Sequence, residues 1–127
     1  MRTLLALVAL VVVACTGPQE RSAPEPLPDE ITTAELAERL DAGDDLVVID
    51  VRTPGEWRNG TIEGALLFAT SEAPDRIDEL DPTLSYAIIC AAGSRSARFA
   101  RLLVEEGFEE VTNVTDGMNG WYEREQR

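Results

Sequence analysis

Two patterns of hydrophobic positions alternate along residues 30–127. Short unbroken apolar runs predict strands, because a strand covered on both faces has no polar side. These runs lie at 46–51, 65–68, 86–90 and 110–114. Stretches with helical spacing and helix-start signals predict helices or helical turns between the strands. They lie at 32–43, 54–60, 71–80, 95–106 and 116–124. Such alternation predicts an α/β fold, a small parallel sheet with helices on both faces.

The first 14 residues follow a different pattern. An apolar run from Leu4 to Ala14 comes after Arg2 and is too short to cross a bilayer as a helix, which needs about 20 residues. We therefore expect residues 1–14 to be a signal peptide. The sequence VVAC at 12–15 resembles the lipobox of bacterial lipoproteins, and this resemblance implies that Cys15 is lipidated. The alternative is an ordinary secretory signal with an incidental cysteine.

A proline-rich segment separates this region from the rest of the chain. Residues 15–29 have no apolar periodicity and predict an extended tether. Residues 30–127 are enough for one domain, which we expect to be monomeric. With a lipidated Cys15, the protein would be exported and anchored to a bacterial membrane, facing the periplasm or the cell exterior.

Charge and composition exclude several classes of function. Asp and Glu number 24 against 11 basic residues, a formal net charge of −13. Such a chain repels phosphate groups, so we expect no nucleic-acid binding. The sequence contains no histidine, which removes the commonest general base and the commonest metal ligand. We expect no metal and no cofactor, and any nucleophile must be activated without imidazole.

Cys90 is the main candidate for chemistry. It lies in the segment CAAGSRS, between a predicted strand and a predicted helix. Inward-facing loop amides, a helix N-terminus and a nearby guanidinium can lower a thiol pKa from about 8.5 to roughly 3.5–7.5. Small residues from Ala91 to Ser94 allow the amides to turn inward, and Gly93 can adopt a positive φ. The alternative is a buried cysteine that only packs against hydrophobic neighbours.

Five motifs resemble those of rhodanese-like sulfurtransferases in order and spacing. They are DVRTPGEW at 50–57, GTIEGALLF at 60–68, CAAGSRS at 90–96, LLVEEGFEEV at 102–111 and DGMNGW at 116–121. The resemblance covers about residues 30–123 and implies a rhodanese-like three-layer sandwich. It also implies that Cys90 accepts a sulfane sulfur from a donor such as thiosulfate and becomes a persulfide. A thiophilic acceptor, cyanide or a thiol, then removes the sulfur, so the expected partners are small sulfur-containing anions and thiol acceptors.

The same resemblance implies roles for residues around Cys90. The substrate-binding loop consists of Ala91, Ala92, Gly93, Ser94, Arg95 and Ser96. Arg95 corresponds to the loop arginine of the family, which would bind the oxyanion of the donor or the persulfide. A structural ion pair with Asp50 or Glu56 is the alternative for Arg95.

Four further residues are expected to support the site: Asp50, Arg52, Glu56 and Arg98. Asp50 and Arg52 belong to the DVR element of the family, and we expect them to tie loops together rather than to act in catalysis. Arg98 is a candidate for attracting an anionic substrate. Thr61 stands where the family commonly has a structural histidine.

Two other functions remain open for the same residues. Related phosphatases place five residues between cysteine and arginine, whereas four separate Cys90 from Arg95, which makes a smaller loop and favours sulfur over phosphate. The second alternative is a lipid-anchored rhodanese module without catalysis, which binds a partner or senses redox state through Cys90. The presence of Cys90, Gly93 and Arg95 together favours the enzyme.

Overall fold

The computed structural model describes residue 17 and residues 26–127. The expected signal peptide and Cys15 lie outside the described residues. Five strands form one parallel sheet in the order β1-β5-β4-β2-β3. The strands are β1 Glu30–Ile31, β2 Leu46–Asp50, β3 Leu66–Leu67, β4 Ser85–Ile89 and β5 Glu110–Val114. Because all five run in the same direction, their carboxyl ends share one edge of the sheet.

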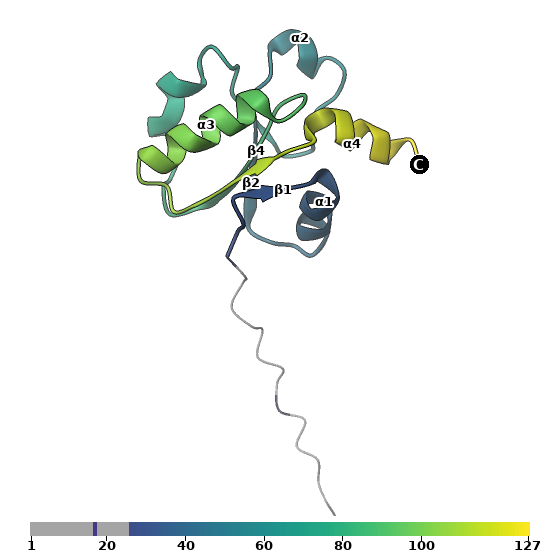
Figure 1. The fold of residues 1–127 in the computed structure, drawn as a ribbon, viewed down its shortest axis with the longest axis horizontal. Helices are drawn as coiled ribbons and strands as arrows, with labels where there is room; N and C mark the ends of the chain where they lie inside the picture. Colours follow the sequence, from purple (N-terminus) through teal and green to yellow (C-terminus); the bar gives the residue numbers. More distant parts are fainter. Residues whose placement is uncertain (1–16, 18–25) are drawn as a thin grey trace, which may run out of the picture.

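Helices cover both faces of this sheet (Figure 1). On one face lie α1 and α4, and on the other lie α3 and the 3-10 helix η1. Their bounds are α1 Thr33–Asp41, η1 Ala73–Glu79, α3 Ser94–Glu105 and α4 Gly117–Glu125. The short helix α2, Pro54–Trp57, follows β2. This arrangement confirms the predicted three-layer α/β fold. Within the described part of the chain, no helix combines the length and apolarity that a membrane span requires.

The central strand β4 separates two hydrophobic cores. Tyr86 and Ile88 belong to the core beneath α3 and η1, whereas Ala87 and Ile89 belong to the core beneath α1 and α4. Successive side chains of a strand point to opposite faces, so Cys90, which follows Ile89, returns to the α3 side. Cys90 is indeed part of the core beneath α3.

Local sequence signals fix the starts of two helices. Thr32 and Glu35 form a capping box at α1, and Thr53 and Glu56 form another at α2. In each box, a threonine hydroxyl and a glutamate carboxylate satisfy backbone N–H groups that the first helical turn leaves free. The second box holds Glu56 close to the carboxyl end of β2.

Several details of the fold differ from the sequence predictions, and three of them bear on the sheet and the site. The sheet has a fifth strand, β1, whose two residues pair with β5 and are too few to show a periodicity. The segment expected as a helix at 71–80 is a 3-10 helix over Ala73–Glu79. Finally, β2 and β4 end at Asp50 and Ile89, one residue earlier than predicted, so Cys90 lies just beyond the strand.

The loop after β4 packs tightly against the turn between β5 and α4. The backbone N–H of Met118 donates to the Cys90 carbonyl over 2.7 Å. The side-chain amide of Asn113 donates to the Gly93 carbonyl over 3.2 Å. Gly93 has a φ of +94°, and a Cβ at this position would collide with the backbone carbonyl of Thr115. Only glycine therefore fits at this point of the loop.

Replacement of Gly93 should show this constraint as a loss of stability. Gly107 is a matched control, because its φ of +91° is nearly the same as the +94° of Gly93 but no atom lies within 4 Å of a Cβ placed there. We expect Gly107→Ala to lower the free energy of unfolding by about 1–2 kcal/mol through backbone strain alone. Gly93→Ala should cost about 1–3 kcal/mol more through the collision. Urea denaturation of both variants measures the difference, and equal losses would contradict the close contact with Thr115.

Candidate active site

Cys90 combines burial with polar contacts. The residue is 1% exposed. Its Sγ accepts a hydrogen bond from the Gly93 N–H at 3.2 Å and lies 3.2 Å from Oγ of Ser96. This burial is what we would expect if Cys90 only packed against hydrophobic neighbours. The hydrogen bonds to its sulfur distinguish Cys90 from such a cysteine.

Opposing effects act on the pKa of the Cys90 thiol. Burial raises the pKa, because the thiolate loses its contact with water. Hydrogen bonds from the Ser96 hydroxyl and from the N–H groups of Ser96, Ala92 and Gly93 lower it, and together they outweigh burial. The pKa of Cys90 therefore lies below its ordinary value. The chain stabilises a thiolate without imidazole.

The expected loop residues have separate roles in this arrangement. Ala92, Gly93 and Ser96 direct N–H groups towards the sulfur. The carbonyl of Ala91 accepts a hydrogen bond from the first turn of α4. Ser94 is exposed and begins α3. The sulfur thus lies at the N-terminus of a 12-residue helix, whose positive dipole end favours a negative charge.

Arg95 forms an ion pair with Glu56, one of the two structural partners considered for it. Its two terminal nitrogens donate to the two carboxylate oxygens of Glu56, each over 2.7 Å. These hydrogen bonds lower the pKa of Glu56 to about 2, so Glu56 is ionised at neutral pH. The pKa of Arg95 is raised mainly by Glu56, and the Cys90 thiol also contributes. The guanidinium therefore lies within electrostatic reach of the sulfur.

Asp50 and Arg52 form a separate, buried ion pair. Asp50 is 0% and Arg52 is 2% exposed, and Nη2 of Arg52 lies 2.8 Å from Oδ2 of Asp50. The remaining donors of Arg52 reach the backbone carbonyls of Glu56 and Gly60 and the Tyr122 hydroxyl. The side-chain hydrogen bonds of Cys90 go to Gly93 and Ser96 and not to these groups. The pair therefore ties together the segments beyond β2. Removing one partner of such a buried pair costs about 3–5 kcal/mol of stability.

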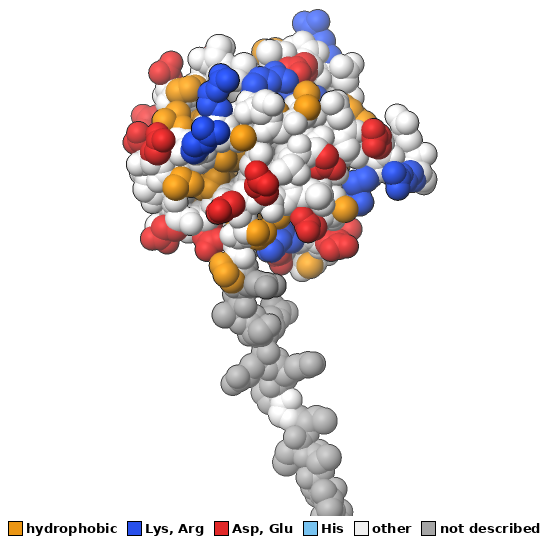
Figure 2. Space-filling view, viewed as in Figure 1, with side chains coloured by type: hydrophobic (Ala, Val, Ile, Leu, Met, Phe, Trp, Pro, Cys, Tyr) orange, Lys and Arg blue, Asp and Glu red, His pale blue; other side chains and the backbone are white. Residues whose placement is uncertain are grey.

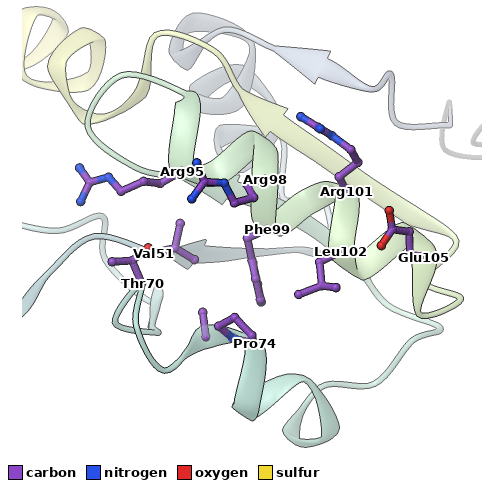
Figure 3. A pocket seen from close by; sticks show the side chains of 10 residues that line it. Val51, Thr70, Pro74, Arg95, Arg98, Phe99, Arg101, Leu102 and Glu105 are labelled. Atoms are coloured by element: carbon purple, nitrogen blue, oxygen red, sulfur yellow. The ribbon is translucent and has the colours of Figure 1, made fainter.

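A cleft of about 340 Å³ opens between α3 and η1 (Figure 3). Apolar side chains of Val51, Pro74 and Phe99 line part of it, and the arginines of α3, among them Arg95 and Arg98, line another part. Arg98 itself is exposed. No group of three or more histidine, cysteine or acidic side chains in the described part of the chain could hold a metal ion.

Some functional contacts were not visible in the sequence. Tyr122 accepts a hydrogen bond from Arg52, 70 positions earlier in the chain, and donates one to the Gly60 carbonyl. Asn113 supports the Cys90 loop from β5. No local pattern connects residues so far apart, and only co-variation in an alignment could have indicated these pairs.

Comparisons with known proteins agree with this geometry. The family model described as Rhodanese-like domain matches residues 32–124. The chain is 38% identical over 92 residues to the putative sulfurtransferase YtwF of Bacillus subtilis, an alignment that covers 72% of this chain and 88% of that protein. It is 31% identical over 91 residues to the thiosulfate sulfurtransferase GlpE of Pseudoalteromonas translucida, with coverage of 72% and 86%.

Solved structures show the same similarity. A rhodanese-like domain protein from Staphylococcus aureus superimposes with a TM-score of 0.69 at 34% sequence identity. The match covers 74% of this chain and 91% of that chain. The chain belongs to the rhodanese-like domain family.

Proposed function

We propose that the protein is a sulfurtransferase that carries a sulfane sulfur on Cys90. The central observation is the Cys90 sulfur itself, which accepts the Gly93 N–H and lies beside the Ser96 hydroxyl. These contacts lower the pKa of the thiol, which favours the nucleophilic thiolate over the thiol relative to an unperturbed cysteine. Relatives named sulfurtransferase support the same class of reaction.

The reaction consists of two displacements. In the first, the Cys90 thiolate attacks the outer sulfur of thiosulfate, a new S–S bond forms, and sulfite leaves with the electron pair of the broken S–S bond. In the second, cyanide or an acceptor thiolate attacks the outer sulfur of the persulfide. The Cys90 sulfur keeps the electron pair of that broken bond and returns to the thiolate. Two successive displacements through a covalent intermediate predict ping-pong kinetics.

Arg95 favours this reaction over the phosphatase alternative. Both terminal nitrogens of Arg95 are occupied by Glu56, so the guanidinium is not free to bind two oxygens of a phosphate group. The charges of Arg95 and Glu56 largely cancel beside the loop. The loop amides, rather than a free guanidinium, then provide most of the stabilisation for a negative sulfur.

Mass spectrometry of the intact protein tests the persulfide. After incubation with thiosulfate and removal of the excess, we expect the mass to increase by one sulfur atom, because the thiolate attacks the donor. Cyanide should restore the original mass. Cys90→Ser should never gain the sulfur, since the hydroxyl is not ionised at neutral pH. An unchanged mass in folded wild-type protein would instead favour the non-catalytic binding module.

The Ser96 hydroxyl should set the pH dependence of the first displacement. The pKa of Cys90 is lowered in part by this hydroxyl, and the rate should rise with pH as the thiolate forms and level off above the pKa. Ser96→Ala removes a donor, so the midpoint should move to higher pH and the rate at neutral pH should fall. Persulfide formation measured across a pH series gives the midpoint. Ser85→Ala, at the opposite end of β4, should leave the midpoint unchanged.

If the midpoint did not move in Ser96→Ala, the hydroxyl would not stabilise the thiolate. The backbone N–H groups alone would then have to account for the lowered pKa.

We further propose that Cys15 carries a lipid and that the domain is exported and anchored to a bacterial membrane. The support is the apolar run that ends in VVAC at 12–15, followed by the proline-rich segment. In a bacterial host, wild-type protein should incorporate labelled palmitate and sediment with membranes, whereas Cys15→Ser should do neither. Wild-type protein that stays unlabelled and does not sediment would contradict the anchor.

A further inference from the structure

We infer that Thr33 and Asp116 are positioning residues for the reaction at Cys90, because their contact holds the helix turn to which the reactive loop is hydrogen-bonded. The inference rests on the proposed function and deepens it. It adds two side chains that act on the sulfur through the backbone, without a hydrogen bond to the sulfur itself.

The carboxylate of Asp116 joins two helices that are far apart in the sequence. Asp116 directly precedes α4, and Thr33 is the first residue of α1. The Thr33 N–H donates to Oδ1 of Asp116 over 2.8 Å, and the Thr33 hydroxyl donates to Oδ2 over 2.7 Å. Thr33 is 1% exposed, and α1 and α4 lie on the same face of the sheet (Figure 1). The contact therefore fixes the start of α4 against the start of α1.

Asp116 stands where an aspartate commonly caps its own helix. A capping carboxylate accepts the N–H of the second or third helical residue, which in α4 are Met118 and Asn119. Asp116 makes no such hydrogen bond, because its carboxylate is bonded to Thr33 of α1. The N–H groups of Met118 and Asn119 are thus left for other acceptors.

The reactive loop supplies these acceptors. The Met118 N–H donates to the Cys90 carbonyl over 2.7 Å, and the Asn119 N–H donates to the Ala91 carbonyl over 3.1 Å. A Cβ at Gly117 would collide with both of these carbonyl groups. The first turn of α4 therefore sets the course of the chain as it leaves Cys90.

One of these hydrogen bonds acts directly on a donor to the sulfur. The carbonyl of Ala91 and the N–H of Ala92 belong to the same planar peptide group. This N–H is among the donors that lower the pKa of Cys90. When Asn119 holds the carbonyl, it also fixes the plane from which the N–H reaches the sulfur. Loss of the contact between Thr33 and Asp116 should loosen this plane and weaken the donor.

Charge effects can be separated from this positioning effect by their sign. The charged side chains of the elements around Cys90 are Arg95 and Arg98 of α3, Glu56 of α2, Asp50 and Arg52 at the end of β2, and Asp116 before α4. Thr33→Val changes none of them. Acidic side chains are spread over the face of the domain that Figure 2 shows, and Asp116→Ala removes one such charge. By itself this removal would lower the pKa of Cys90, whereas loss of positioning raises it.

Titration of the Cys90 thiolate measures the effect. Ultraviolet absorbance is recorded against pH for each variant with and without Cys90→Ser, and the difference gives the midpoint. In Asp116→Ala we expect the midpoint to rise by about 0.4–1 pH unit, which corresponds to one weakened hydrogen bond. Thr33→Val loses only the hydroxyl donor, so its midpoint should rise by no more than this. The double variant should match Asp116→Ala, because both substitutions break the same contact.

Three variants serve as controls. Thr83 donates its N–H and its hydroxyl to Oδ1 of Asp81 over 2.9 and 2.7 Å, a similar contact before the amino end of β4. Thr83→Val should therefore keep the wild-type midpoint. Thr33→Ser retains the hydroxyl and should keep it as well. Gly107→Ala lowers stability without touching the loop, so an unchanged midpoint in this variant separates positioning from a general loss of stability.

The outcomes separate this inference from the proposed function. Asp116 is exposed, so Asp116→Ala should fold, which urea denaturation checks. A wild-type midpoint in folded Asp116→Ala, or an additive rise in the double variant, would overturn the positioning role. The titration detects the thiolate and not sulfur transfer. If wild-type protein forms no persulfide, the proposed function fails, and the midpoints still decide whether Thr33 and Asp116 hold the loop.

Discussion

The structure depends on the hydrogen bonds that converge on the buried sulfur of Cys90. Burial opposes ionisation of this thiol, and the N–H groups of the loop together with the Ser96 hydroxyl reverse that effect. The reversal requires the amides of the loop to point at one atom, which holds only while the loop keeps its shape. The rest of the domain can be understood as the support for this shape.

Two neighbouring parts of the domain hold the Cys90 loop in this shape. The first turn of α4 donates hydrogen bonds to the backbone carbonyls of Cys90 and Ala91. Thr115, between β5 and α4, leaves no space for a side chain at Gly93. Beyond β2, the buried pair of Asp50 and Arg52 fixes the segment that carries Glu56, and Glu56 in turn holds Arg95. Because Asp50 is fully engaged by Arg52, Glu56 is the carboxylate left for Arg95. The site is thus assembled from the carboxyl ends of neighbouring parallel strands, where α/β proteins commonly place their ligands.

Local patterns predicted much of this arrangement, and long-range packing accounts for the remainder. The apolar run at 86–90, the capping signals of α1 and the small residues after Cys90 each act over a few positions, so the strand, the helix and the loop could be predicted. The choice of partner for Arg95 could not be predicted, since the sequence left both Asp50 and Glu56 open. The structure shows that Arg52 occupies Asp50. The contact of Gly93 with Thr115 and the contact of Tyr122 with Arg52 join distant segments and leave no local signal. The strand β1 has only two residues, too few for any pattern.

The most direct test of the central claim is a titration of the Cys90 thiol itself. The ultraviolet absorbance of the thiolate is recorded against pH for wild-type protein and for Cys90→Ser, and the difference isolates Cys90. The hydrogen bonds to the sulfur predict a midpoint below that of an unperturbed cysteine, which a short cysteine peptide in the same buffer provides. A midpoint at or above that value would show that burial prevails over the hydrogen bonds, and it would contradict a thiolate held ready at neutral pH.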